Sequence, residues 1–326
     1  MIAALLLLLA AIAIYYCAES FTNGVEWLGM RLKLGQTATG TVLAAIGTAL
    51  PESVVTLVAT AFADHPSQQE IGIGAAIGGP LALSTIAYMM VGIALFLQRR
   101  CPLLSEAQRK RLNRDQWIFL LIFAVKIALG LLDFPGKELC GWGFLVAYCV
   151  YMLGEIRHPG VLDEAEELHP LMIRRRDADP AIGWILLQVL GAAAVTFLAS
   201  RLFVAQLDAL APILGAEPQL VALFLSPIAT ELPETLNALI WVRQGKDRLA
   251  LANVSGSMMI QATIPTSFGL FFTPWRLDRP LLLAGAATAL SILYLTQLFR
   301  RAEINPLPLA LVGAPLAALL IGLIGW

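Results

Sequence analysis

Long apolar segments, separated by short polar connections, run along the whole chain. Ten segments can be drawn, over residues 3–30, 37–63, 70–97, 115–133, 138–155, 181–210, 218–242, 248–272, 280–299 and 306–325. Most approach or exceed the ~20 residues that a helix needs to cross a bilayer. Their apolar residues run on without the alternation that marks a barrel strand. The pattern therefore predicts an all-α polytopic membrane protein with ten transmembrane helices.

One polar stretch is longer than the others and divides the chain into two halves. It contains the charged sequences DEAEELH and RRR. We expect a first five-helix repeat over 1–156, a cytoplasmic linker loop over 157–180 and a second five-helix repeat over 181–326. Because five is an odd number, the second half enters the membrane from the opposite side. Related halves would then form an inverted-topology repeat.

Charged residues are scarce and unevenly distributed. They make up 14% of the chain, against about 25% in soluble domains. If the amino terminus lies outside, the inner connections hold most of the 22 Lys and Arg residues, and the outer ones hold only Lys137, Arg276 and Arg279. This excess predicts an external amino terminus, and we expect a bacterial inner-membrane location. The net charge of −1 shows no excess of basic residues of the kind that indicates nucleic-acid binding.

The same short motif occurs once in each half. GTALPE in the first half and ATELPE in the second place Glu52 and Glu234 182 residues apart. The following segments, EIGIGAAIGGPLALS and RLALANVSGSMMIQA, also resemble each other. Within the first of them, Gly74 and Gly78 predict close packing against a neighbouring helix. A repeat of this kind, weak in identity but consistent in position, is typical of transporters.

Each motif brings together groups that a hard cation binds. Proline has no N–H and clashes with the carbonyl one turn back, so Pro51 and Pro233 free backbone carbonyls. A freed carbonyl in lipid is costly unless something occupies it, and the glutamate that follows adds a carboxylate. Calcium takes roughly six to eight such oxygens. An alternative stays open, because Pro-Glu is also an ordinary helix opening with an acid at the positive end of the helix dipole.

These stretches resemble a known family. GTVLAAIGTALPESVVTL and FLSPIATELPETLNAL, each followed by a Gly/Ser-rich helix, are similar to the two α-repeats of the cation/calcium exchanger superfamily, which includes the sodium/calcium exchangers. The likeness covers nearly the whole chain. It implies ten helices in two inverted halves and the exchange of Ca²⁺ for H⁺ or Na⁺ by alternating access. In that mechanism the first and sixth helices slide past a core of helices two, three, seven and eight.

The resemblance implies where the transported Ca²⁺ is bound. The family pattern is G-T-S-L-P-E in helices two and seven and G-N-x-x-G-S-N in helices three and eight. The expected ligands are the motif threonines and glutamates, the helix-eight asparagine and serine, and two residues that depart from the pattern. They are Thr48, Glu52, Thr230, Glu234, Asn253, Ser257, Glu231 and Gln261.

The departures from the pattern bear on the counter-ion. Ala49 and Gly79 stand where the pattern has serines, and Ala75 and Leu83 also replace polar residues. The first half has thus lost small polar groups of the kind that hold sodium in relatives. The second half has gained Glu231, which either coordinates the cation, carries a proton or faces a water-filled vestibule. Carboxylates in one low-dielectric site rarely all ionise, which favours H⁺ over Na⁺ as counter-ion, although both stay open.

Lys126, Glu19 and Arg201 are further charged residues within the apolar segments. Lys126 requires a partner at the depth of the bilayer, and Asp133, two turns away, is a candidate. Glu19 and Arg201 lie at the repeat offset of 182 residues, so they either pair with each other or face solvent in a groove.

Two other classes of function compete with an antiporter. A cation channel of similar fold would keep the ligands but would need a continuous pore. An intramembrane enzyme would need a catalytic motif, and the sequence has neither HExxH nor GxSxG. We therefore predict that the protein is no enzyme but a secondary active cation antiporter. Its expected partners are membrane lipid and the transported cations, with no obligate protein partner. A divalent or monovalent cation other than Ca²⁺ stays an alternative.

Overall fold

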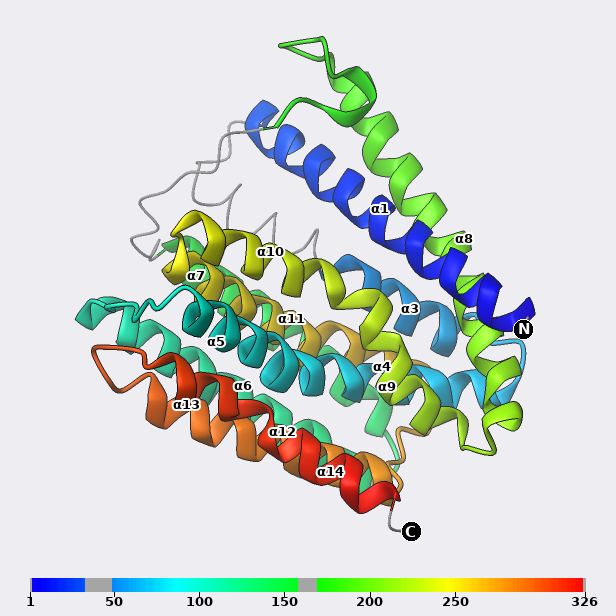
Figure 1. Ribbon diagram of the computed structural model, residues 1–326. Helices are drawn as coiled ribbons and strands as arrows, with labels where there is room; N and C mark the ends of the chain where they lie inside the picture. The colour runs from blue at the N-terminus through cyan, green and yellow to red at the C-terminus, as the bar shows by residue number, and fades with distance from the viewer. Residues whose placement is uncertain (1, 33–48, 158–168, 325–326) are drawn as a thin grey trace.

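Helices make up nearly all of the structure, a computed structural model that describes residues 2–32, 49–157 and 169–324 (Figure 1). The α-helices are α1 (Ile2–Arg31), α3 (Leu50–Ala61), α4 (Pro66–Ala82), α5 (Tyr88–Leu97), α6 (Glu106–Leu131), α7 (Cys140–Arg157), α8 (Ile182–Leu214), α9 (Pro218–Thr230), α10 (Leu232–Gln244), α11 (Asp247–Phe272), α12 (Arg279–Leu298), α13 (Pro306–Ala310) and α14 (Ala314–Ile324). Apart from an isolated pairing between Leu103 and Glu303, the described residues form no β-structure. The all-helical prediction is confirmed for this part of the chain.

Four helical stretches are long and apolar enough to cross a membrane. They are Ile2–Arg31, Pro66–Leu97, Ile182–Leu214 and Arg279–Leu298. The second of them joins α4 and α5 through a π-helical turn over Leu83–Ala87. Shorter apolar helices cover Leu50–Ala61, Pro218–Thr230 and Pro306–Gly322. Length and composition therefore fit a protein that crosses the membrane several times.

Two predicted segments have different boundaries in the structure. The segment 218–242 is two helices, because Pro233 cannot donate a hydrogen bond to the preceding turn and the chain leaves the helix at Glu231. The segment 115–133 begins earlier, at Glu106. There Ser105 and Gln108 form a capping box, which satisfies free N–H groups of the first turn.

The last predicted segment, 306–325, is also interrupted. A 3-10 turn over Leu311–Gly313 separates α13 from α14. Pro315 lies in the first turn of α14 and has no N–H for the carbonyl of Leu311, which favours an interruption of the helix there.

α1 and α8 lie side by side along one edge of the molecule, where Figure 1 shows them standing apart from most of the bundle. Gln188 Nε2 of α8 donates to Asn23 Oδ1 of α1 at 3.0 Å, and Trp27 Nε1 donates to the His169 carbonyl at 2.9 Å. Arg201 of α8 lies 3.4 Å from Asp64, so its ion partner in the structure is not Glu19. These two long helices therefore form one unit at the side of the bundle.

α4 packs closely on α9 through small residues. A Cβ added at Gly74 would lie 2.2 Å from the Gln219 carbonyl oxygen, and one at Gly78 would lie 2.4 Å from that of Leu223. Only glycine fits at either place, because the opposing atoms are backbone. The predicted role of Gly74 and Gly78 in helix packing is confirmed.

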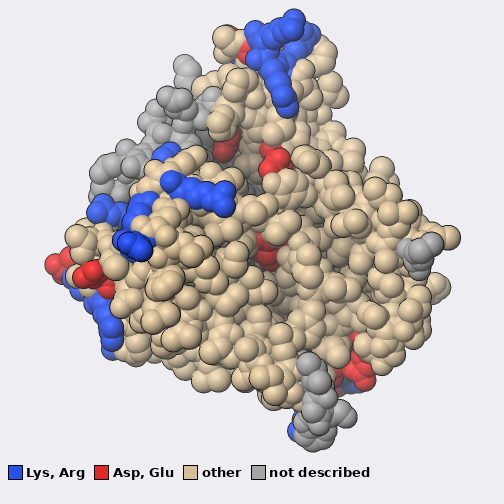
Figure 2. Space-filling view, viewed as in Figure 1, with Lys and Arg blue, Asp and Glu red and all other residues tan. Residues whose placement is uncertain are grey.

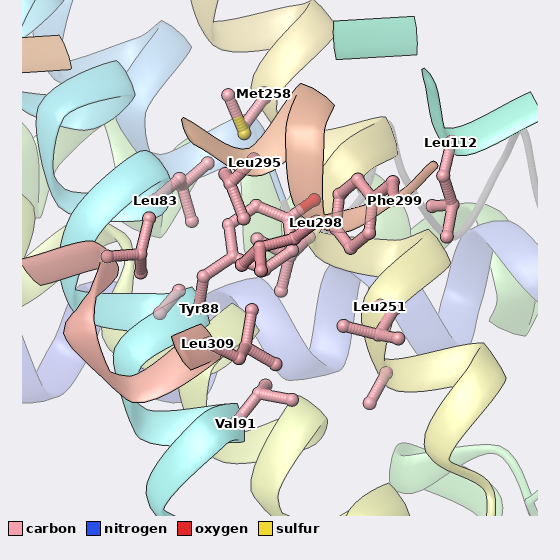
Figure 3. Close-up of a cluster of buried hydrophobic side chains, with 14 of the residues drawn as sticks. Leu83, Tyr88, Val91, Leu112, Leu251, Met258, Leu295, Leu298, Phe299 and Leu309 are labelled. Carbon is pink, nitrogen blue, oxygen red and sulfur yellow. The ribbon is translucent and has the colours of Figure 1, made fainter. Parts of the chain in front are cut away.

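A large apolar cluster fixes α11 against the opposite side of the bundle (Figure 3). It joins residues of α5, α6, α11, α12 and α13 that are nearly all inaccessible to solvent. They include Tyr88, Val91, Leu251, Met258, Leu295, Phe299 and Leu309. Met258 of α11 lies in this cluster.

The charged side chains of the visible face lie mostly at its margins. Figure 2 shows Lys and Arg gathered toward the upper and left edges, and a small patch of Asp or Glu near the centre of an otherwise uncharged region. Arg100, in the connection after α5, pairs with Asp247 at the start of α11 at 2.6 Å. Arg111 and Arg114 of α6 both pair with Glu155 of α7. These ion pairs tie the helix ends together on the basic side of the protein.

Candidate cation-binding site

Both LPE motifs open a helix in the interior of the protein. α3 begins at Leu50 with Glu52 in its first turn, and α10 begins at Leu232 with Glu234 in its first turn. Neither helix has a side-chain cap at its start. Both glutamate side chains are 0% exposed. The motif is thus a helix opening and also a buried acid, located where the helix dipole favours negative charge.

Glu52 reaches from α3 to α9, where hydroxyl groups surround it. Thr230 Oγ1 donates to Glu52 Oε2 at 2.7 Å, and Ser226 Oγ lies 3.5 Å from the same oxygen. Thr56 Oγ1 lies 3.5 Å from Glu52 Oε1. The structure thus brings together two predicted ligands, Glu52 and Thr230. Ser226 and Thr56 were not predicted, although each lies four residues from one of these two, a spacing that puts side chains on one helix face.

Glu231 turns its carboxylate toward α11. Gln261 Nε2 donates to Glu231 Oε1 at 2.7 Å, and Thr230 Oγ1 lies 3.3 Å from that oxygen. Glu231 Oε2 and Gln261 Oε1 are buried and have no hydrogen-bond partner among the described residues. Buried polar atoms normally have partners, so these two oxygens are available to a cation. Gly79 of α4 faces them, since a Cβ there would lie 2.8 Å from Gln261 Oε1.

Three predicted ligands share one face of α11. Asn253, Ser257 and Gln261 follow one another at intervals of four residues. Ser257 is fully buried. Its hydroxyl and the Asn253 Nδ2 have no hydrogen-bond partner in the described part of the chain. This face therefore carries polar groups that the other described residues leave unsatisfied.

The three glutamates lie near one another. Glu52 and Glu231 share the Thr230 hydroxyl, which lies 2.7 Å from Glu52 Oε2 and 3.3 Å from Glu231 Oε1. Glu234 follows Glu231 by three residues, in the first turn of α10. Within residues 2–32, 49–157 and 169–324, no three acidic, His or Cys side chains converge as a ready-made metal site. A cation would thus need hydroxyl, amide and backbone oxygens beside the carboxylates, a mixture that suits Ca²⁺. The remaining predicted ligand, Thr48, lies outside the described residues.

The predicted partner of Lys126 is wrong. Asp133 lies beyond the end of α6, where it is exposed and pairs with Arg276. Lys126 points inward instead and is 0% exposed, and its Nζ donates to the Ala76 carbonyl at 2.6 Å. Ala76 lies one helical turn before Gly79, which faces Gln261 and Glu231. The lysine therefore belongs to the interior of the bundle, close to the acidic region.

Apolar helices of membrane-spanning length that bury several acids are typical of a membrane transporter. The family profile described as sodium/calcium exchanger protein matches residues 2–156 and 184–323. The chain belongs to this family. It is accordingly an integral membrane protein of the transporter class and not an enzyme.

Known proteins share both sequence and fold with the chain. The inner membrane protein YrbG of Escherichia coli strain K12 is 24% identical over 293 residues, which cover 85% of this chain and 82% of YrbG. The crystal structure of the H⁺/Ca²⁺ exchanger CAX has a TM-score of 0.77 and 16% identity, with 99% of this chain and 82% of CAX covered. The sodium-calcium exchanger NCX_Mj has a TM-score of 0.63 and 19% identity, with 98% of both chains covered. The chain therefore has the exchanger fold.

Proposed function

We propose that the protein is a secondary active antiporter that exchanges Ca²⁺ for H⁺ or Na⁺ by alternating access. The observation that carries this proposal is the burial of Glu52, Glu231 and Glu234 at the ends of α3, α9 and α10. Acids inside a membrane protein are unfavourable unless they are paired, protonated or bound to a cation. A Ca²⁺ role is supported by the fold shared with proteins named as H⁺/Ca²⁺ and sodium-calcium exchangers.

The transported Ca²⁺ is bound by oxygens from both halves of the chain. Glu52 and Glu234 are the principal ligands, and Glu231 adds a third carboxylate. The neutral oxygens come from the hydroxyl and amide groups of the surrounding helices. The proposed set is Thr48, Glu52, Thr230, Glu231, Glu234, Asn253, Ser257 and Gln261. Hydrogen bonds from Thr230 to Glu52 and from Gln261 to Glu231 support their grouping.

The chain consists of two inverted repeats of five transmembrane helices, over 1–156 and 181–326, joined by the loop 157–180. The start of α3 at Leu50 and of α10 at Leu232 supports this, because these positions differ by the same 182 residues as the two motifs. α1 and α8 occupy matching places and pack mainly on each other. They are the helices that slide past α3, α4, α10 and α11 during transport.

The amino terminus and the connection after α6 lie outside a bacterial inner membrane, and the linker lies in the cytoplasm. Arg100, Arg111 and Arg114 all lie at helix ends on the proposed cytoplasmic side. An excess of basic residues in cytoplasmic connections supports this orientation.

H⁺ is favoured over Na⁺ as the counter-ion. Ala49 and Gly79 offer no side-chain oxygen to a sodium ion in the first half. Glu231 is 2% exposed and therefore buried within the protein. A buried carboxylate beside two others can exchange a cation for a proton without any further ligand.

Calcium uptake into proteoliposomes tests the function and the counter-ion together. An imposed pH gradient should drive ⁴⁵Ca²⁺ uptake, whereas a sodium gradient of equal size should not. Uptake driven only by sodium would reverse the choice of counter-ion. Calcium flux that runs down the calcium gradient alone, without movement of H⁺ or Na⁺ in the opposite direction, would indicate a channel.

A further inference from the structure

Lys126 is a buried charge that the proposed calcium ligands leave unexplained. It lies in the last third of α6, and its side chain is 0% exposed. Within the described part of the chain, its ammonium has no ion pair at 4.0 Å or less. A charged side chain at this depth is normally paired or functional.

The ammonium donates a hydrogen bond to a backbone carbonyl that a proline has left without its helical partner. In a regular helix, the Ala76 carbonyl would accept a hydrogen bond from the N–H of residue 80. That residue is Pro80, which lies inside α4 and has no N–H. Lys126 Nζ donates to this carbonyl at 2.6 Å. The Ala76 carbonyl, like the carbonyls freed by the motif prolines, can bind a cation. In the structure the lysine ammonium binds it.

Two aromatic rings complete the surroundings of the ammonium. Lys126 Nζ lies 5.5 Å from the ring centre of Phe123 and 6.0 Å from that of Trp275. The faces of aromatic rings attract cations. Trp275 is held in turn by a hydrogen bond from its Nε1 to the Lys126 carbonyl at 3.1 Å. The protein has therefore built a fixed place for a positive charge.

This place adjoins the acidic region. Ala76 lies one helical turn from Gly79, which faces Gln261 and Glu231. The ammonium is therefore part of the electrostatic environment of the proposed calcium site.

We propose that Lys126 is a tethered cation of the calcium site, which fills the position of a monovalent ion and balances one of the three buried carboxylates. This inference rests on the proposed function. Three ionised carboxylates carry three negative charges, of which one Ca²⁺ balances two and the ammonium balances the third. The site then holds Ca²⁺ without a monovalent metal ion beside it. Lys126 is a specificity-determining residue that excludes such an ion.

Radioactive sodium binding at saturating Ca²⁺ tests the proposal on purified, full-length protein. The wild type should bind ⁴⁵Ca²⁺ and retain no ²²Na⁺ beside it. Lys126→Ala removes the ammonium and leaves the Ala76 carbonyl free, so this variant should retain about one ²²Na⁺ per chain alongside Ca²⁺. Lys126→Arg keeps the charge and should retain none. A lysine with a merely structural role would not produce this gain of sodium binding.

The outcomes separate the inference from the function on which it rests. A wild type that binds no Ca²⁺ contradicts the proposed function itself. A folded Lys126→Ala protein that retains no ²²Na⁺ overturns the inference, as does a wild type that holds Na⁺ together with Ca²⁺. If Lys126→Ala fails to fold, Lys126→Met replaces it, because methionine keeps most of the volume without the charge, and the same gain is expected.

Discussion

Matched positions before the two motif helices hold different residues. Ala49 precedes α3, and Glu231 precedes α10 at the repeat offset. Ala49 is buried in an apolar cluster with Tyr148 and Ile260. Glu231 instead accepts a hydrogen bond from Gln261. One half therefore presents an apolar wall where the other presents a carboxylate, and the site is asymmetric in spite of its repeated sequence.

Neutralising Glu52 should weaken calcium binding without unfolding the protein. Hydrogen bonds and contacts to a charged group contribute about 1.5–3 kcal/mol, which corresponds to roughly 10- to 100-fold in affinity. We expect Glu52→Gln to lose that much ⁴⁵Ca²⁺ binding and nearly all uptake. Glu106→Gln is the control, because Glu106 is exposed and pairs with Lys110 on the surface. Full uptake by Glu52→Gln would exclude a central role for this carboxylate.

A methyl group at Gly79 should disturb the site more than the fold. The new Cβ would lie 2.8 Å from Gln261 Oε1 and 3.4 Å from Glu231 Oε1, so Gln261 must move away. We expect Gly79→Ala to lower calcium uptake at least about tenfold, a change of ~1.4 kcal/mol. Gly191→Ala is the matched control, since a Cβ at Gly191 has no described atom within 4 Å. Equal uptake by both variants would contradict the placement of Gly79.

At the scale of elements, the contact between α4 and α9 should be sensitive to a single methyl group. A Cβ at Gly78 would lie 2.4 Å from the Leu223 carbonyl oxygen, and a backbone atom cannot easily give way. Overpacking of this kind typically costs about 1–3 kcal/mol. Gly78→Ala should therefore lower the midpoint of thermal unfolding, whereas Gly143→Ala, with open space around the new Cβ, should not. The change in midpoint is measured on purified protein in detergent.

The sequence predicts the elements better than their contacts. Pro51 and Pro233 set the starts of α3 and α10 locally, so both helix openings follow from the motif alone. The capping box at Ser105 is local too. The first turns of α6 are polar, however, so a hydropathy pattern misses them and predicts a start at residue 115 instead of Glu106. The hydrogen bond between Thr230 and Glu52 joins residues 178 positions apart. Only the shared family pattern, and no local rule, could place them together.

Lys126 shows why long-range partners escape sequence reasoning. Asp133 lies near it along the chain, yet α6 ends at Leu131 and leaves that aspartate exposed. The actual acceptor is the backbone carbonyl of Ala76, which is free because of Pro80. A backbone acceptor has no signature of its own in a sequence. Proline inside an apolar helix is the one signal that could have pointed to it.

At the scale of the whole molecule, labelling of single cysteines tests the proposed orientation. The native Cys17, Cys101, Cys140 and Cys149 are free thiols and must first be replaced. Glu138→Cys, before α7, should react with a membrane-impermeant maleimide in spheroplasts, where the reagent reaches the outer side of the inner membrane. Asp177→Cys, in the linker, should react only in inverted vesicles. The reverse pattern would place the amino terminus inside.

The most direct test of the central claim is the position of the bound cation. Crystals soaked with Ca²⁺ or Mn²⁺ give an anomalous scattering signal that locates the ion independently of any assumed role. We predict a single strong peak between Glu52 and Glu234, within coordination distance of at least one of these carboxylates and near Gln261. A cation bound only elsewhere, with no peak between the two glutamates, would contradict the assignment of this region as the transport site.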